Sequence, residues 1–528
     1  MFRLLRMLRE ARFYAKLALG LRRLSQTPPH VVFEASIQDQ LEHREERWLA
    51  LVREVIYGQD SHPYRRMMAE ARCEWDDLAS LVRSSGLTRA LEALRESGVY
   101  LSHDEFKGRT TIVRGGREIE ATSDSFNNPT ADGLLGTISS GSRSGGTFTF
   151  ESIEYRLYRE NYYRLVWKEF GLSDYEVLAL EAILPSQNGI ASCLKTSRIG
   201  SRLEKWYSVG GALRDSWHYR AATAGFVALG NLLGAKGRYP DYLPDDDFLP
   251  VADWLAGRRA AGASCVVETN VSSAVRVSAA ACDSGLDISS TLFLVGGETL
   301  SSPKRLAIER SGAAPYPNYW LTETGPVGYA CLSMTTGSSV HLFEDSLEAI
   351  QYRRRLPGSS EEVNSLLLTT LHPSAPRVLI NVETDDAGVI EQARCECCFS
   401  RLGLRRVIRD VASYGKLTGM GVTLSTWDLV NLLEVRLPAR FGGGPGDYQL
   451  AETEGRNGSS RVCLRFSPRL ETVAPQEIRQ GFLTELKRCH GGSTAIRAWS
   501  HAGVFTVEQS APITGATGKV LPVCLLRD

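Results

Sequence analysis

Short apolar runs alternate with helical stretches over residues 131–300, and this alternation constrains the fold more than any other feature of the chain. The runs Val177–Leu184, Cys265–Glu268 and Ser290–Gly296 have the length and composition of strands. Ile153–Phe170 shows the apolar and charged spacing of a helix. Strands that alternate with helices form a sheet with helices on its faces. We therefore expect an α/β core.

Three regions of different pattern divide the 528 residues, a length that allows more than one domain. Residues 1–130 are mainly helical by their apolar spacing, and Ser102 or Asp104 is the expected cap of a helix near their end. Residues 131–409 hold the α/β core, and residues 410–528 show the strand and helix mixture of an α+β domain. We expect a large N-terminal α/β domain, which includes the helical region, and a small mobile C-terminal α+β domain.

The later part of the core, residues 340–408, is rich in strand-forming residues. Strands are expected at Ser365–Leu371 and Val378–Val382. A turn is expected at Asp386–Gly388, because its Asp-Ala-Gly sequence is typical of turns.

The composition excludes several classes of protein. Lysine plus arginine equal aspartate plus glutamate at 61 each, so no net charge draws the chain to nucleic acid. No apolar run approaches the ~20 residues of a transmembrane helix, and no signal-peptide pattern is present. The eleven cysteines are scattered except at residues 395–398, which suits a reducing compartment. We expect a cytoplasmic protein without nucleic acid or membrane as a partner, and oligomerisation stays open.

Residues 1–23 carry a local excess of charge, with seven basic residues and one acidic residue among apolar ones. This spacing suits a helix with a basic face. Two interpretations stay open. The helix binds a membrane surface, or it docks its apolar face on its own protein. The second is favoured, because nothing else in the sequence suggests lipid.

One polar loop and two single charged residues carry related chemistry. Residues 139–147 hold four serines, three glycines, one threonine and Arg143, and glycines in such a loop let backbone N–H groups surround a phosphate. Glu323 is a hard oxygen ligand suited to Mg2+. Lys519 is a compact charge on a flexible stem, and it can offset charge that develops in a transition state. Together these segments suit a reaction of a nucleotide.

Five motifs follow one another in a fixed order: Ile138–Thr147, Val295–Leu300, Asn318–Gly325, Leu379–Asp386 and Pro512–Lys519. In this order they resemble the nucleotide-handling motifs of adenylate-forming enzymes, which are the acyl-CoA synthetases and their relatives. Within that superfamily they resemble the phenylacetate-CoA ligase branch most. The resemblance covers roughly residues 98–524, and it implies a large α/β domain with a small mobile C-terminal domain.

The resemblance implies a role for each matching residue. Thr322 lies near the α-phosphate, Glu323 binds Mg2+ and Lys519 bridges the substrate carboxylate and the α-phosphate, so these three are the expected catalytic residues. The expected ATP-binding residues are Ser139, Ser140, Gly141, Ser142, Arg143, Thr147, Gly296, Gly297, Glu298, Asn318, Tyr319 and Asp386. The expected hinge residues are Arg409, Asp410 and Lys416. The chain departs from the family pattern at Arg143, Ser144, Gly146, Trp320 and Asp385, and Ser144, Trp320 and Asp385 replace glycines.

The implied reaction is ATP-dependent activation of a carboxylic acid, expected to be aromatic, as an acyl-AMP with release of pyrophosphate. ATP and Mg2+ are the implied cofactors. CoA is the common acceptor in the family, while an amine, an alcohol or the thiol of a separate carrier protein stays open as an alternative. A non-catalytic nucleotide-binding protein on the same scaffold is the third possibility. The replaced glycines support it, whereas the joint presence of Lys519, Glu323 and Asp386 argues against it.

A candidate zinc site begins at Cys395 and Cys397, which offer two thiolates two residues apart. Such a pair is half of a tetrahedral zinc site. In the phenylacetate-CoA ligase branch a cysteine and a histidine after the Thr-Glu motif complete the site, and here they would be Cys331 and His341. A closed set of three thiolates and one imidazole indicates structural zinc. Cys398 could compete as a ligand, and four ordinary buried residues are the alternative.

Overall fold

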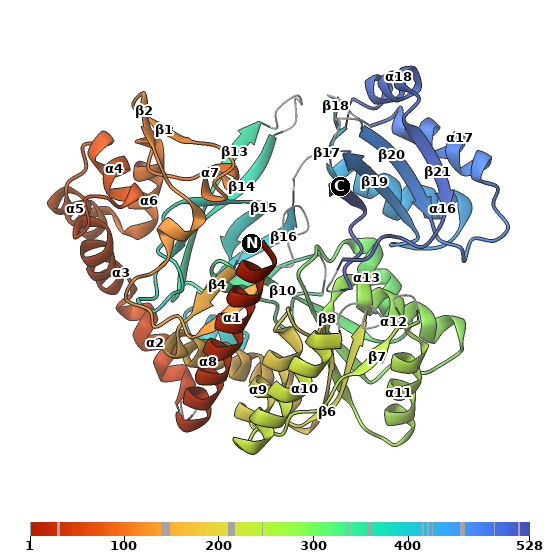
Figure 1. Cartoon of the computed structure of the whole chain (residues 1–528), viewed down its shortest axis with the longest axis horizontal. Coiled ribbons are helices and arrows are strands. Elements are labelled where there is room, and N and C mark those ends of the chain that lie inside the picture. Colours follow the sequence, from red (N-terminus) through yellow and green to blue (C-terminus); the bar gives the residue numbers. More distant parts are fainter. Residues whose placement is uncertain are drawn as a thin grey trace.

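The computed structural model describes most of the chain (Figure 1). The described residues are 2–28, 32–138, 148–209, 217–244, 247–335, 337–355, 362–413, 417–419, 422–424, 426–454, 460–489, 491–515 and 518–527. A large lobe holds the N-terminal and central parts of the chain, and the C-terminal residues, blue in Figure 1, form a smaller lobe beside it.

The N-terminal region is mainly helical, as its spacing predicts. Its helices are α1 (Phe2–Gln26), α2 (Phe33–Glu42), α3 (Arg44–Val52), a π-helical turn (Arg53–Tyr57), α4 (Pro63–Glu70), α5 (Trp75–Ser85), α6 (Leu87–Glu96) and α7 (His103–Phe106). Ser102 caps α7, because its hydroxyl accepts from the backbone N–H of Glu105 while the Glu105 carboxylate accepts from the N–H of Ser102. Two hairpins and a 3-10 turn follow: β1 (Ile112–Arg114), β2 (Arg117–Ile119), Ser123–Phe126, β3 (Leu135–Ile138) and β4 (Phe148–Glu151).

A mixed sheet of twelve strands runs through the large lobe in the described part of the chain, in the order β13-β14-β15-β16-β12-β11-β10-β9-β8-β5-β6-β7. From β7 to β10 neighbouring strands are parallel, and from β10 to β13 they are antiparallel. The strands are β5 (Glu176–Leu180), β6 (Leu203–Val209), β7 (Asp241–Leu243), β8 (Cys265–Asn270), β9 (Thr291–Gly296), β10 (Ala314–Leu321), β11 (Gly325–Tyr329), β12 (Val340–Leu342), β13 (Leu347–Arg355), β14 (Glu362–Thr370), β15 (Val382–Gln392) and β16 (Arg406–Ser413).

Helices cover both faces of the parallel half, which confirms the expected α/β fold. Strand β5 shows why: Val177 and Ala179 pack into one hydrophobic core, and Leu178 and Leu180 pack into another, since successive strand residues point to opposite faces. Helices α8 (Ile153–Phe170), α9 (Asn188–Arg198) and α10 (Trp217–Leu232) supply the first core, with a 3-10 turn at Leu172–Asp174. Helices α11 (Leu249–Ala260), α12 (Val271–Asp283) and α13 (Ser302–Glu309) supply the second.

Two local predictions in the antiparallel half are wrong. Val378–Asn381 form no strand, because the buried Asn381 adopts a φ of +50° while its amide donates to the Leu91 and Val99 carbonyls at 2.8 and 3.1 Å. Asp386–Gly388 form no turn and lie within β15. The strand bulges there instead, since its pairing with β16 shifts register between Ala387 and Val389.

The described side chains of helix α1 pack against the large lobe, as the favoured interpretation expects. Phe13, Leu17, Leu21 and Leu24 are buried in the same core as α8. Arg198 fixes the end of the helix by donating to the Leu24 and Thr27 carbonyls at 2.8 and 3.0 Å. This apolar face is therefore used within the large lobe. Among the described residues, no helix is both long and apolar enough to span a membrane.

The small lobe has its own sheet and its own hydrophobic core. Its elements are β17 (Leu417–Gly419), β18 (Val422–Leu424), α15 (Thr426–Asn431), a π-helical turn (Leu432–Arg436), α16 (Leu437–Phe441), β19 (Tyr448–Glu454), β20 (Ser460–Phe466), α17 (Pro475–Leu486), α18 (Gly492–Ala502), β21 (Phe505–Gln509) and β22 (Val523–Arg527). Four strands pair in the order β21-β20-β19-β22. Leu450, Val462 and Phe482 belong to the core beneath them. The expected domain boundary at residues 409 and 410 falls inside β16 of the large sheet.

Candidate active site

A cavity of about 280 Å³ opens at the carboxyl ends of the parallel strands. This end of an open α/β sheet is where ligands bind in proteins of this architecture. Its lining includes five of the residues predicted from the sequence: Gly296, Gly297, Asn318 and Thr322 from one stretch of the chain, and Lys519 from near the C-terminus. The fold therefore brings three of the predicted motifs to one place.

Lys519 of the small lobe reaches into the large lobe beside Gly297. A Cβ atom at residue 297 would lie 2.6 Å from the Lys519 Nζ, so any larger residue there would displace the ammonium from this position. Gly297 also has a φ of +76°, a conformation that glycine adopts without strain. The next residue anchors the loop, because the Val520 N–H donates to the Ser272 Oγ at 3.1 Å. The contact between the two lobes thus places an ammonium at the predicted nucleotide segment.

The rest of the Gly-Gly-Glu segment is equally constrained. A Cβ at Gly296 would lie 2.0 Å from the side-chain oxygen of Asn318, so this glycine makes room for the amide. Glu298 is held by Ser272, whose N–H donates to Oε2 at 3.1 Å. Its Oε1 is buried and accepts no hydrogen bond from the described part of the chain. Burial raises the pKa of Glu298 above its usual range, although Lys304 opposes this shift. The Glu298 Oε1 is therefore an unused acceptor within the segment that is expected to lie along adenine.

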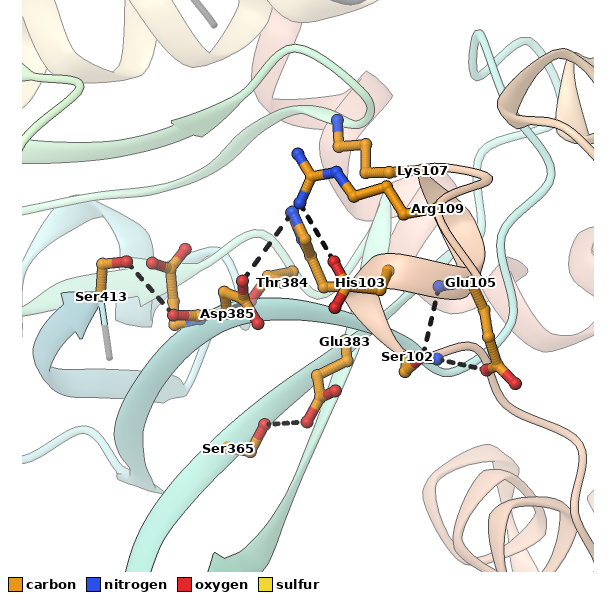
Figure 2. Close-up of polar contacts among 12 residues, drawn as sticks. Ser102, His103, Glu105, Lys107, Arg109, Ser365, Glu383, Thr384, Asp385 and Ser413 are labelled. Atoms are coloured by element: carbon orange, nitrogen blue, oxygen red, sulfur yellow. Dashed lines mark hydrogen bonds and ion pairs between the residues drawn. The ribbon is translucent and has the colours of Figure 1, made fainter. Parts of the chain in front are cut away.

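Tyr319 and Asp386 meet although 67 residues separate them, because the Tyr319 hydroxyl donates to Asp386 Oδ2 at 2.7 Å. Asp385 has a φ of +60°, the left-handed region that favours glycine. This conformation accounts for the glycine that the family has at the position. Helix α7 lies over this part of β15, with His103 Nε2 at 3.8 Å from Asp385 Oδ2 (Figure 2). The predicted ribose-binding residue therefore stands in a network built by β10, β15 and α7.

Glu323 forms a buried ion pair with Lys107, a residue at the end of α7 that the sequence did not single out. Both side chains are 15% exposed. Burial alone would raise the pKa of Glu323, but the Lys107 ammonium outweighs burial and holds the pKa below its usual range. The carboxylate is therefore ionised, as an oxygen ligand of Mg2+ must be. Figure 2 shows His103 on α7 and Lys107 on the turn that follows this helix.

Trp320 lines the cavity where the family has glycine. Its ring lies parallel to that of Tyr163, with 6.4 Å between centroids and 10° between planes, and the Arg159 guanidinium stands 4.1 Å from it. Trp320 and Tyr163 thus give the cavity an aromatic wall. Trp206 and Trp217 do not line this cavity: Trp206 is buried in the core and Trp217 is 72% exposed.

The proposed zinc ligands converge at β12, the strand that holds His341. The side-chain donor atoms of Cys331, His341, Cys395 and Cys397 all lie within 4.8 Å of one another. The His341 Nε2 is 3.2 and 3.1 Å from the Cys395 and Cys397 sulfurs, and those sulfurs are 3.5 Å apart. Zinc with Zn–S bonds of about 2.3 Å holds tetrahedral sulfurs about 3.8 Å apart, so the set fits zinc after small adjustments.

The surroundings of the four residues agree with this fit. The His341 Nδ1 lies 3.1 Å from the Leu404 carbonyl, which would orient the ring with Nε2 toward a metal. Cys398 lies outside the set, because its Sγ accepts from Arg401 at 3.6 Å. The competition that the sequence left open is therefore decided against Cys398 by geometry.

Several predicted residues take no part in the described site. The phosphate loop with Ser139, Ser140, Gly141, Ser142, Arg143 and Thr147 lies outside the described residues, and so does Lys416. Of the expected hinge, Arg409 pairs with Glu391 at 2.9 Å. Asp410 adopts a φ of +53° inside β16, which is an uncommon conformation for any residue but glycine.

Four further side chains belong to the site and were not singled out from the sequence: Lys107, Glu181, Lys195 and Glu268. Lys195, Glu181 and Glu268 line the cavity. The sequence held one signal for two of them, because Glu181 directly follows the apolar residues 177–180 and Glu268 ends the run Cys265–Glu268. Residues in such places can line a ligand site, since the carboxyl ends of parallel strands gather there. Lys107 gave no comparable signal.

Comparison with known proteins adds evidence on the fold. No protein-family model and no curated protein matches the chain. Solved structures do match, among them a 2-hydroxyisobutyryl-CoA ligase in complex with 2-HIB-AMP, at 14% identity and a TM-score of 0.51 over 90% of this chain and 88% of that chain.

Two other matches are more distant. An anthranilate CoA ligase, AuaEII, in complex with anthranoyl-AMP shares 12% identity over 73% of this chain and 65% of its own, at a TM-score of 0.41. The amide bond synthetase McbA from Marinactinospora thermotolerans shares 12% identity over 89% of this chain and 97% of its own, at a TM-score of 0.37. The ligase with the TM-score of 0.51 therefore carries the comparison, and it establishes a shared fold.

Proposed function

We propose that this chain, which has the fold of the adenylate-forming enzymes, activates a carboxylic acid with ATP and transfers the acyl group to a second nucleophile. The observation that carries the proposal is Lys519 seated against Gly297, at the mouth of a cavity large enough for a small acid. A lysine that the small lobe places beside the predicted adenine segment can help to join two anions. Packing alone does not explain this position, because an ammonium group normally stays in water.

In the first step a carboxylate oxygen attacks the α-phosphorus of ATP, and the bond from that phosphorus to the β-phosphate oxygen breaks. Both reactants are anions, so fixed positive charge must offset their repulsion. Lys519 would lie between the carboxylate and the α-phosphate, and Thr322 would donate to the α-phosphate. Asp386, oriented by Tyr319, would accept from the ribose hydroxyls.

Mg2+ fits this site through Glu323, whose carboxylate is ionised and faces Lys107. Bound there, Mg2+ would neutralise phosphate charge. Lys107 balances the same carboxylate when nucleotide is absent, and on nucleotide binding its ammonium would become available to the phosphates.

In the second step a nucleophile attacks the acyl carbon, and the bond from that carbon to the phosphate oxygen breaks with release of AMP. CoA is the first candidate, because the ligase of the same fold is a CoA ligase. An amine is the second, as the alternative acceptor that the sequence left open. An alcohol or the thiol of a separate carrier protein remains open.

The Cys3His set supports a further part of the proposal, a structural zinc ion held by Cys331, His341, Cys395 and Cys397. With all four positions filled by protein, no position would remain for substrate. Zinc would tie β12 to the segment before α14 (Cys398–Arg401). It would link this chain to the phenylacetate-CoA ligase branch, where such a set occurs.

Carboxylate-dependent ATP–pyrophosphate exchange tests the first step. We expect exchange with one or more acids of an aryl, amino-aryl and fatty acid panel. Exchange requires reversible formation of an acyl-AMP, so it reports adenylation without knowledge of the acceptor. If calorimetry shows no binding of ATP, the proposal is wrong.

Replacement of Asp386 by asparagine is expected to raise the KM for ATP in this exchange by about tenfold to 100-fold, the effect of losing a hydrogen bond to a charged group. The kcat should change little, since the ribose does not react. Asp76→Asn, an exposed position on α5, is the matched control. An unchanged KM for ATP in Asp386→Asn would remove this residue from the nucleotide site.

Replacement of Glu323 by glutamine is expected to lower the kcat of exchange by about 10²–10³-fold, because the variant loses the charge that would hold Mg2+. The Mg2+ concentration needed for half-maximal exchange should rise in the same variant. Glu477→Gln, an exposed position on α17, is the control. Unchanged Mg2+ dependence would show that Glu323 serves only to balance Lys107.

A further inference from the structure

One wall of the cavity carries buried ionisable groups that adenylation itself does not require. The Lys195 ammonium of α9 donates to Glu268 of β8, and the Ser192 hydroxyl donates to the same carboxylate at 2.9 Å. Lys195 and Glu268 are only 8% and 7% exposed. Removing an ion pair from water costs several kcal/mol per ion, so such a pair is a weak source of stability. A role in binding gives a physical reason for its presence.

Glu181 adds a second carboxylate to this wall. It follows β5 directly, lines the cavity and hydrogen-bonds to the Asn188 amide. Burial raises its pKa to about 7, and Glu268 adds to the rise, while Asn188, Lys195 and Lys519 oppose it. The positive charges around Glu181 therefore do not compensate its burial. A cationic or hydrogen-donating group of a ligand would do so.

Gln187 is an independent sign that a polar ligand occupies this space. Its side-chain nitrogen is buried and meets no hydrogen-bond partner in the described part of the chain. The same residue lines the cavity. Buried polar groups almost always have partners, so this amide nitrogen can donate a hydrogen bond to an acceptor atom of a ligand in the cavity.

The ionisable side chains Glu181, Lys195 and Glu268 and the catalytic candidate Lys519 come from different places along the sheet. Lys519 stands at Gly297 after β9, whereas Glu181 follows β5, and the sheet order β9-β8-β5 separates them by two strand spacings, about 10 Å. Aromatic side chains, Tyr163 and Trp320 among them, line the space. An acid that reaches both ends would carry a ring between two polar groups.

We propose, on the basis of the adenylation reaction above, that the acid activated by this chain carries an amino group remote from its carboxylate, and that Glu181 and Glu268 bind this group. Lys195 holds Glu268 in position through their ion pair. Trp320 and Tyr163 contact the ring that joins the two ends. The substrate class is therefore an amino-substituted aromatic acid, narrower than the aromatic acid expected from the sequence.

Matched acids test this proposal in the unmodified enzyme. Benzoic acids that differ only in the group opposite the carboxylate (amino, aminomethyl, hydroxyl, methyl or carboxylate) are compared by kcat/KM in ATP–pyrophosphate exchange. We expect an amino-bearing member to exceed the methyl member by about 100-fold or more, because a site built for a polar group rejects the analogue that lacks it. A methyl or carboxylate member that reacts as fast as the amino-bearing members would overturn the proposal.

Glu181→Gln tests the residue itself, since it keeps the size of the side chain and removes the charge. The ratio of kcat/KM for the amino-bearing acid to kcat/KM for the methyl acid should fall at least tenfold. Glu176→Gln is the matched control: Glu176 begins β5, the strand that Glu181 follows, pairs with Arg258 and does not line the cavity. Equal loss for both acids in Glu181→Gln would show a merely structural role. If that variant fails to fold by circular dichroism, the comparison of acids in the unmodified enzyme decides.

Failure of this inference is distinguishable from failure of adenylation. Exchange without a preference for amino-bearing acids overturns the inference alone. Absence of ATP binding by calorimetry overturns both. If ATP binds but no acid supports exchange, calorimetry of the same acids in the presence of ATP decides, and tighter binding of the amino-bearing members supports the inference.

Discussion

Replacement of Lys519 by alanine is expected to lower carboxylate-dependent ATP–pyrophosphate exchange by about 10²–10³-fold or more, because a preorganised charge aimed at the reacting atoms acts where water is excluded. The Lys519 ammonium fills the space beside Gly297 that a side chain would otherwise take. Its contribution should appear in kcat. ATP binding should persist, since Tyr319 and Asp386 lie in the large lobe and keep their contact.

The control is Lys487→Ala, which removes an exposed lysine directly after α17 in the same lobe. Both variants lose one positive charge, so a difference between them reports position and not net charge. The reverse reaction from a chemically synthesised acyl-AMP should fall in parallel, because both directions share one transition state. Full exchange in Lys519→Ala would show that the contact with Gly297 only docks the small lobe.

Purified protein is expected to contain one zinc ion per chain by elemental analysis, and Cys397→Ser is expected to lose it. Structural zinc contributes about 10–16 kcal/mol in small zinc-binding domains. Even a loss of about 3 kcal/mol would lower the Tm by about 6–12 °C, at 2–4 °C per kcal/mol for domains of a few hundred residues. The Tm of Cys397→Ser should fall by at least this much, and a strong chelator should produce the same shift in the unmodified protein.

Cys398→Ser is the matched control for the zinc site. Cys398 is the next residue in the chain, but its sulfur contacts Arg401 and not the Cys3His set. We expect this variant to keep its zinc and most of its stability. Zinc loss from both variants would place Cys398 among the ligands, and a zinc-free unmodified protein of full stability would refute the structural zinc site.

The sequence anticipated elements whose cause is local. Ile153–Phe170 is helical because its apolar spacing follows the helical period, and α8 has these same bounds. Ser102 caps α7 because its hydroxyl and the Glu105 carboxylate lie three residues apart. The predictions failed where a distant contact overrides local preference. Asn381 holds a left-handed conformation through bonds to Leu91 and Val99, which ends the strand expected there.

In the candidate site, too, the sequence anticipated some residues and missed those that depend on distant contacts. The order of the motifs placed Gly297, Asn318 and Lys519 in one expected nucleotide site, and the structure brings these three together at one cavity. Sequence spacing could not place Lys107 on Glu323, which lies 216 residues away in the chain. Nor could it join Lys195 to Glu268, because that contact depends on β5 lying beside β8 in the sheet.

By itself the sequence determined the α/β alternation and the ordered motifs, because periodicity, residue type and order along the chain are all written in it. Its resemblance to the phenylacetate-CoA ligase branch implied the Cys3His set but left Cys398 as a competing ligand. The tertiary structure alone decided which distant charges share a cavity and which cysteine lies outside the metal set. The physical reason is that strand order and the docking of one lobe on the other arise from burial of apolar surface, which is non-directional. No local pattern records the pairs of residues that this burial brings together.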